Sequence, residues 1–227
     1  MSVCISIYSL VYRLLANHVI DGVVSGIMSR EMHRAPKTHI IYVSGLGDGY
    51  DTLRRFCLRF WRIYGVYVEF IPSKWSNDED FETKRDRIER AAKSANERGR
   101  KVVIMGESAG GSLVLNVYAR IPDVIHRVVT LCGKNVGPDN VAPRLYTRNR
   151  SFQDSMRQVG HSVRSLSLSQ RQRITCIYAL SDLTVPLADT LIDDCRRLRL
   201  WFVGHITTIF FGLTIGSFLL VREARRP

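Results

Sequence analysis

Short runs of apolar, often β-branched residues alternate with stretches of helical periodicity along most of the chain. Six runs have the length and composition of strands: residues 39–43, 66–71, 101–105, 126–132, 174–179 and 199–203. The run at 101–105 is almost wholly apolar, as expected of a strand that is covered on both faces. Strands that alternate with helices predict a mostly parallel sheet with crossover helices.

The helices expected between these strands follow from apolar stripes and from residues that favour helix ends. From about residue 51, apolar side chains recur at helical spacing, and Gly65 is placed to stop this helix. The stripe consists of Leu53, Phe56, Cys57, Phe60 and Tyr64. Asn77 or Asp78 is expected to cap the next helix. Later helices are expected over residues 109–120 and 205–222.

Length and composition indicate one globular domain. The 227 residues are 45% hydrophobic and 24% charged, which is typical of a folded protein and too apolar for a disordered chain. Residues 1–36 precede the first strand and look helical, so we expect an N-terminal helical segment there and one α/β domain over 37–227. Residues 134–172 are basic, polar and rich in turn formers, which indicates a cap inserted into that domain.

The net charge of +12 favours contact with anionic surfaces such as phospholipid head groups. Much of this charge lies in the cap segment. No nucleic-acid-binding motif accompanies it, so its arginines are expected to form a solvated face and no nucleic-acid partner is expected. The five cysteines lie at irregular intervals without a C-x-x-C pair, which indicates reduced thiols in a cytoplasmic protein rather than a zinc site.

The run from Leu200 to Val221 raises the question of a membrane segment. Its 22 residues contain one ionisable side chain, that of His205, and the run is long enough to cross a bilayer. A buried strand followed by a mostly buried helix gives the same pattern, and we favour this interpretation because the sheet otherwise loses its last strand. Membrane association of this helix or of the N-terminus is the alternative. The N-terminus lacks a basic lead-in and a clear cleavage site, so no cleaved signal peptide is expected.

The strongest chemical signal is the string Gly106-Glu107-Ser108-Ala109-Gly110, which follows an apolar strand and precedes a helix. A nucleophile elbow needs small residues on both sides of the serine, because the chain turns sharply there. Such a turn exposes the Ser108 hydroxyl at the carboxyl edge of the sheet. It also places the backbone N–H of Ala109 at a helix start, where developing negative charge is favoured. An ordinary glycine–serine turn is the alternative.

From about residue 39 to the last helix, the chain resembles the α/β-hydrolase family. The elbow string is similar to that of the family's esterases and lipases, and Ser44-Gly45-Leu46-Gly47 is similar to its His-Gly-x-Gly oxyanion loop, with Ser44 in place of the usual histidine. The resemblance implies a three-layer α/β-hydrolase fold with about six mostly parallel strands and helices on both faces. It also implies that the Leu46 N–H is an oxyanion donor beside that of Ala109. A simple strand-to-helix turn is the alternative for this loop.

A serine nucleophile needs a base and a group that orients the base. In the family the chain order is serine, acid, histidine. Asp182 lies directly after the fifth strand, and Asp182-Leu183-Thr184-Val185-Pro186 resembles the family's acid loop, although a turn cap is the alternative for Asp182. Of the six histidines, His205 alone follows both other members. The resemblance therefore implies a Ser108–Asp182–His205 triad.

The function expected from this resemblance is hydrolysis of a carboxylic ester or thioester, from a small-molecule or lipid substrate, through an acyl-enzyme. No metal or organic cofactor is implied. Two alternatives stay open. One is a non-catalytic binding protein of the hydrolase fold that uses its basic cap on an anionic partner, and the other is a membrane-tethered protein with a C-terminal anchor.

Overall fold

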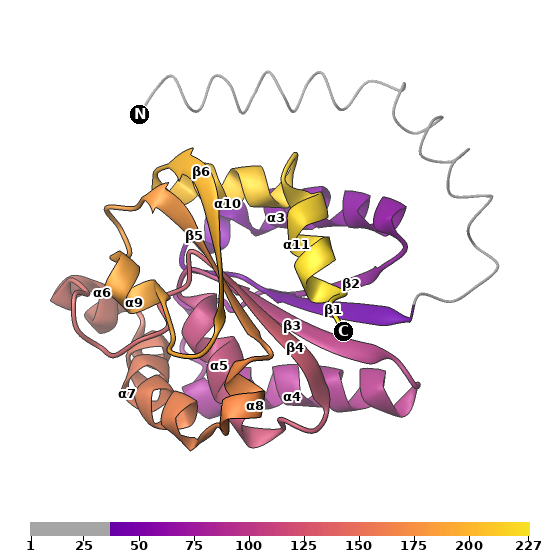
Figure 1. Ribbon diagram of the computed structural model, residues 1–227. Helices are drawn as coiled ribbons and strands as arrows, with labels where there is room; N and C mark the ends of the chain where they lie inside the picture. The colour runs from indigo at the N-terminus through magenta and orange to yellow at the C-terminus, as the bar shows by residue number, and fades with distance from the viewer. Residues whose placement is uncertain (1–36) are drawn as a thin grey trace. The chain divides into compact units, whose positions relative to one another are not determined.

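The computed structural model describes residues 37–227, and six of its apolar segments form one fully parallel sheet (Figure 1). The strand order is β2-β1-β3-β4-β5-β6. The strands are β1 (Thr38–Val43), β2 (Tyr67–Ile71), β3 (Lys101–Glu107), β4 (Ile125–Leu131), β5 (Ile174–Ser181) and β6 (Arg196–Val203). All six expected strands are confirmed, with ends that differ by a few residues. The N-terminal helical segment expected over 1–36 lies outside the described residues.

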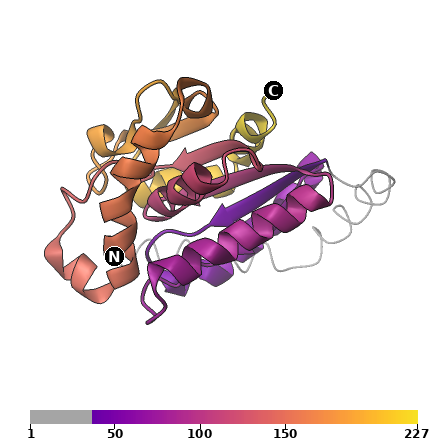
Figure 2. The same ribbon diagram turned by 90° about the horizontal axis from the view of Figure 1, so that it is seen from below.

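Helices cover both faces of the sheet, and each face has its own buried core. On one face lie α4 (Phe81–Glu97), α5 (Gly110–Arg120) and α7 (Arg150–Ser165). On the other lie α3 (Asp51–Arg59), α10 (His205–Leu213) and α11 (Ser217–Ala224). Figure 2 shows the long helix α4 lying along the sheet. The architecture is the expected three-layer α/β arrangement.

The inner strands are apolar at successive positions because alternate side chains enter different cores. On β1, Ile41 packs into the core beneath α4 and α5, whereas Ile40 and Tyr42 pack into the core beneath α3 and α10. On β3, Ile104 packs into the core beneath α4 and α5, and Met105 packs into the core beneath α3 and α10. Their side chains are fully buried. This arrangement explains why these segments have no polar face in the sequence.

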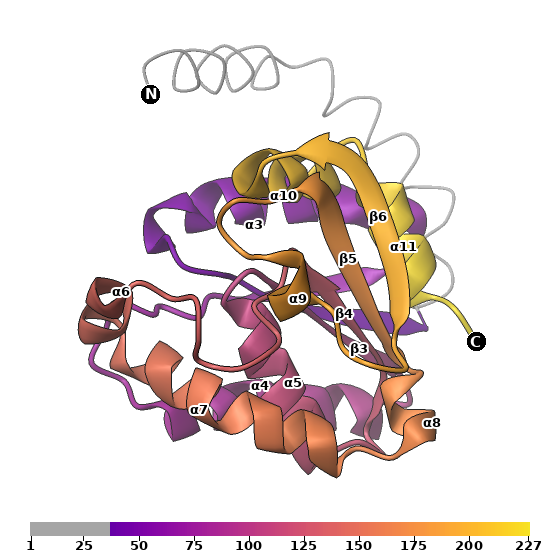
Figure 3. The same ribbon diagram turned by 60° about the vertical axis from the view of Figure 1, so that its left-hand side comes forward.

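The cap predicted over residues 134–172 stays a prediction, and within this segment the structure shows a long helix, α7, that packs against the sheet's helical layer. Helix α7 lies beside α5 (Figure 3). Its Phe152, Met156 and Val159 side chains are buried in the same core as α5. A polar contact reinforces the packing, because the Ser155 and Ser112 hydroxyls lie 2.8 Å apart. The remaining helices of the segment, α6 (Pro143–Arg148) and α8 (Leu168–Arg171), are short.

The start of α4 differs from expectation. The N-cap of α4 is Asp80, whose carboxylate accepts a 2.6 Å hydrogen bond from the Thr83 N–H. Asn77, an expected cap, lies ahead of the helix, and its side-chain oxygen accepts from the Lys84 ammonium instead. Lys84 is buried, so it needs this acceptor, and the loop before α4 is shaped around it.

The last expected helix, 205–222, is broken into α10 and α11, which meet at an angle of 73°. Gly216 lies at the break, where the Phe211 ring packs so closely that a side chain would collide with it. Within residues 37–227 no single helix is long and apolar enough to cross a membrane, although the bent pair meets the length and composition criteria together. The start of the apolar run, residues 200–203, belongs to β6.

Candidate active site

Three strands end at the carboxyl edge of the sheet with a side chain of interest immediately after each. Ser108 follows β3, Asp182 follows β5, and His205 follows β6 after one glycine. The carboxyl ends of parallel strands share one edge, which is where ligands bind in open α/β sheets. The Gly204 N–H donates to the Ser181 carbonyl over 2.8 Å and ties the last two strand ends together. The sheet topology therefore gathers residues that are far apart in the sequence.

Ser108 occupies a strained turn, with φ of 48° in the left-handed region that residues with a side chain rarely adopt. Backbone hydrogen bonds hold this conformation: the Ser108 N–H donates to the Leu131 carbonyl over 3.0 Å, and the Lys134 N–H donates to the Ser108 carbonyl over 2.9 Å. A Cβ on Gly106 would lie 2.6 Å from the carbonyl carbon of Gly110. The glycines therefore allow the strand and helix to approach closely enough for the turn to form.

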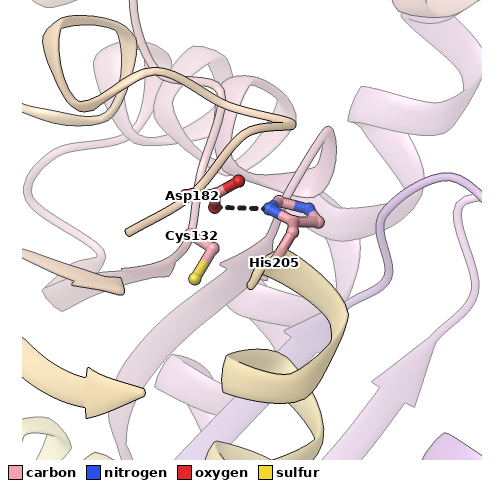
Figure 4. Close-up of side chains that lie close together, drawn as sticks. All are labelled: Cys132, Asp182 and His205. Carbon is pink, nitrogen blue, oxygen red and sulfur yellow. Dashed lines mark hydrogen bonds and ion pairs between the residues drawn. The ribbon is translucent and has the colours of Figure 1, made fainter. Parts of the chain in front are cut away.

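The Ser108, His205 and Asp182 side chains form a continuous chain of hydrogen bonds. His205 Nε2 lies 2.8 Å from Ser108 Oγ, and His205 Nδ1 lies 2.7 Å from Asp182 Oδ2. Figure 4 shows the imidazole and the carboxylate facing each other. Because an ionised carboxylate only accepts, it fixes the proton on Nδ1 and leaves Nε2 free to accept the serine proton. The arrangement can therefore take a proton from the Ser108 hydroxyl.

The Asp182 carboxylate is held in its ionised form by its partners. Burial alone would raise the pKa of this carboxyl, but the hydrogen bonds from His205 and from the Val185 and Thr184 N–H groups lower the pKa below its ordinary value. The two backbone groups donate to Oδ1 over 3.0 and 2.8 Å, which leaves Oδ2 for His205. A charged carboxylate is what stabilises an imidazolium during proton transfer.

The loop that carries Leu46 lies directly against the elbow. A Cβ on Gly45 would lie 2.8 Å from the Ser108 Cβ, so only a glycine allows this approach. Ser44 anchors the loop: its carbonyl accepts from the Ser73 hydroxyl over 2.6 Å and from the Trp75 indole over 3.3 Å. Ala109 is the N-cap of α5. The oxyanion roles of Leu46 and Ala109 stay predictions.

A buried charged cluster beneath the elbow was missed in the sequence. Glu107 accepts from the Arg54 Nε over 2.7 Å, from the Tyr42 hydroxyl over 2.5 Å and from the Gly45 N–H over 3.3 Å. Arg54 also donates to the carbonyls of Gly47 and Leu46, over 2.8 and 3.3 Å. The guanidinium thus bridges the elbow and the Leu46 loop. The available signal was an acidic residue at the end of an otherwise apolar strand, which has to be paired when buried.

Replacing Arg54 with methionine should destabilise the fold by about 3 kcal/mol, because it leaves the Glu107 carboxylate buried without its cationic partner. Arg59→Met is the matched control, since Arg59 is exposed on the same helix, α3. Urea denaturation measures both variants. Equal midpoints for the two variants would contradict the importance of the buried pair.

Cys132 lies beside the hydrogen-bonded chain, and its sulfur, an Asp182 oxygen and a His205 nitrogen all lie within 4.8 Å of one another (Figure 4). A metal ion would require the thiolate of this cysteine. Burial and the Asp182 charge raise the pKa of the Cys132 thiol well above its ordinary value, which favours the neutral thiol. Asp182 and His205 are also bonded to each other. The set suits proton transfer better than metal binding.

Two cavities lie elsewhere and share no lining residue with the hydrogen-bonded chain. One, of about 460 Å³, is lined by Val141, Pro143, Tyr146, Thr147, Arg150 and Gln153. The other, of about 420 Å³, is lined by Tyr64, Phe218, Val221, Arg222, Arg225 and Arg226. Neither cavity is lined by a nucleophile–base pair, whereas the sheet edge holds one, so the candidate site is the sheet edge.

No protein-family model matches the chain, and no curated protein sequence matches it. Solved structures with a similar arrangement include one reported for the metagenome-derived lipolytic enzymes LipS and LipT (TM-score 0.60, 12% identity, 84% of this chain and 92% of that chain covered). Est1E from Butyrivibrio proteoclasticus is similar as well, with a TM-score of 0.60 and 11% identity over 86% of this chain and 92% of that chain. Carboxyl esterase 2 from Tuber melanosporum is also similar, with a TM-score of 0.59 and 14% identity over 83% of this chain and 78% of that chain. These similarities show that the chain has the α/β-hydrolase fold.

Proposed function

We propose that this chain is a serine hydrolase that cleaves a carboxylic ester or thioester through an acyl-enzyme. The observation that carries the proposal is the continuous hydrogen-bonded chain from Ser108 through His205 to Asp182 at the carboxyl edge of the sheet. The serine is held on a strained elbow, its hydroxyl is paired with a base, and the base is oriented by a carboxylate, which is the set of groups that acyl transfer requires.

In the proposed reaction, His205 Nε2 takes the hydroxyl proton of Ser108 as the Oγ attacks the substrate carbonyl carbon. Asp182 holds the imidazole in position and stabilises its positive charge. The N–H groups of Leu46 and Ala109 are assigned to the oxyanion of the tetrahedral intermediate. His205 then protonates the leaving group. Water, deprotonated by the same base, attacks the acyl-enzyme and releases the carboxylic acid.

The surroundings of the site favour an acyl substrate of apolar character. Leu183, next to Asp182, is 99% exposed, and Ile206, next to His205, is 61% exposed. Similar solved structures are described as lipolytic enzymes or esterases, which supports an ester of a small molecule or a lipid. The net charge of +12 would favour a substrate presented on an anionic membrane surface.

Hydrolysis of 4-nitrophenyl esters of increasing acyl length tests this proposal. We expect the wild-type protein to release 4-nitrophenolate at a rate far above that of the Ser108→Ala variant, which retains the fold and the surface. A thioester of the same acyl group separates the two substrate classes. Equal rates for wild type and variant across the series would contradict the proposal and favour a non-catalytic binding protein.

A further inference from the structure

Two cysteines that play no part in the proposed reaction lie in contact at the edge of the sheet. Cys176 is on β5, fully buried, and Cys195 is partly exposed in the bend directly before β6. Their sulfur atoms are 3.4 Å apart. Both are free thiols. The sequence does not reveal this contact, because 18 residues separate the two cysteines and no recognisable motif joins them.

The environment of this pair separates the roles of the two sulfurs. The hydrogen bond with Cys176 lowers the pKa of Cys195, as do a backbone N–H group and the charge of Arg197, although burial opposes them. The hydrogen bond with Cys195 and burial raise the pKa of Cys176 well above its ordinary value. Cys195 is therefore the more acidic and the more accessible member of the pair, and Cys176 is the less acidic, enclosed member. A thiolate is the form that reacts with oxidants.

We propose that Cys176 and Cys195 form an oxidation site, at which a peroxide converts the two thiols into an intramolecular disulfide. The Cys195 sulfur attacks the peroxide oxygen, breaks the O–O bond and becomes a sulfenic acid, and with hydrogen peroxide one water is released. The Cys176 sulfur then displaces the hydroxyl from the Cys195 sulfur, which forms the S–S bond and releases a second water. Two thiols are oxidised and one peroxide is reduced.

The sulfur atoms must approach from contact distance to a bond of about 2.05 Å. Cys176 is fixed by the strand, where the Asn135 amide lies 3.6 Å from its sulfur. Cys195 follows the turn at Asp193 and Asp194, outside any strand or helix, and can supply the movement. The bond would close a ring over residues 176–195, which includes the acid loop at Asp182. Oxidation should therefore raise the thermal midpoint of unfolding, since the ring limits the unfolded chain.

Other thiols provide the contrast. Burial raises the pKa of Cys57 to about 11 and raises that of Cys132 further, so both are expected to react slowly with peroxide. Both lie in the core on the opposite face of the sheet from Cys176. Cys57→Ser is therefore the matched control, because it removes a buried thiol without touching the proposed pair.

The experiment treats the folded, reduced protein with hydrogen peroxide, alkylates the remaining thiols and digests the product with trypsin. Arg173 and Arg196 flank the pair with no lysine or arginine between, so one peptide, 174–196, contains both cysteines. We expect this peptide to lose the mass of two hydrogen atoms and to resist alkylation, in wild type and in Cys57→Ser alike. In Cys176→Ser, the Cys195 sulfenic acid should persist and be trapped by dimedone.

Two results would overturn the proposal. One is a peptide 174–196 that still carries two alkylated cysteines when another thiol of the chain is already oxidised. The other is a Cys176→Ser protein that forms no dimedone adduct at Cys195. Both readouts are masses, so they are independent of esterase activity and separate this proposal from the proposed function.

Discussion

Replacing His205 with alanine is expected to lower kcat for a 4-nitrophenyl ester by about 10⁴-fold to 10⁶-fold. The imidazole is the only group seen bonded to the Ser108 hydroxyl among the described residues, at 2.8 Å, so its loss leaves a neutral serine with no base to take its proton. The substrate-binding surface and the elbow are retained. The loss should therefore appear in kcat, with little change in KM.

His161→Ala is the matched control for this variant. His161 is exposed on α7 and takes no part in the hydrogen-bonded chain, so its removal should leave kcat unchanged. Circular dichroism and thermal unfolding of both variants show whether the fold is retained. A folded His205→Ala protein with wild-type turnover would contradict the role of His205 as the base.

Replacing Gly106 with alanine is expected to lower the free energy of unfolding by about 3 kcal/mol. A Cβ at this position would collide with the Gly110 carbonyl group and lie 2.9 Å from the Gly111 nitrogen. These atoms are backbone at the start of α5, so they cannot rotate away as a side chain would. Relief requires α5 to move from β3, which opens the packing beneath the elbow.

Gly49→Ala is the control for the Gly106 variant. No atom lies within 4 Å of a Cβ built on Gly49, so the substitution should change the free energy of unfolding by less than about 0.5 kcal/mol. Denaturant titrations of both proteins provide the comparison. Similar midpoints would show that the strand and helix at the elbow do not need the close approach at Gly106.

The four inner strands could be predicted from the sequence because burial on both faces leaves a simple pattern. Residues such as Ile40 and Ile41 have to be apolar, since they enter opposite cores. The helix α7 was harder to predict from the sequence. Its exposed face carries arginines and its buried face mixes Phe152 and Met156 with serines, so the segment has the composition of a surface cap although it packs as a crossover helix.

The end of the chain was harder to predict for a different reason. A strand, a turn at Gly204 and two short helices together give one apolar run, because exposed apolar side chains such as Trp201 and Ile215 stand between buried ones such as Leu200 and Leu220. The break at Gly216 depends on the Phe211 ring packing against it. A contact of this kind is a property of the packed structure, and hydropathy along the chain does not reveal it.

The three residues of the candidate site follow from the resemblance, which supplies the chain order, and from their positions after strands. The structure brings Ser108, Asp182 and His205 into one hydrogen-bonded chain, and their catalytic roles stay predictions. The pairing of Glu107 with Arg54 was not predictable, since it joins two residues 53 positions apart through a core that only the fold creates. The same holds for the contact between Cys176 and Cys195.

Reaction with a fluorophosphonate probe tests the central claim most directly, because the probe labels a serine that is activated by a base. The account predicts one adduct per chain on wild-type protein, located at Ser108 by peptide mapping, and none on Ser108→Ala. Labelling of Ser108→Ala to the same extent as wild type, or an adduct at another residue, would contradict it.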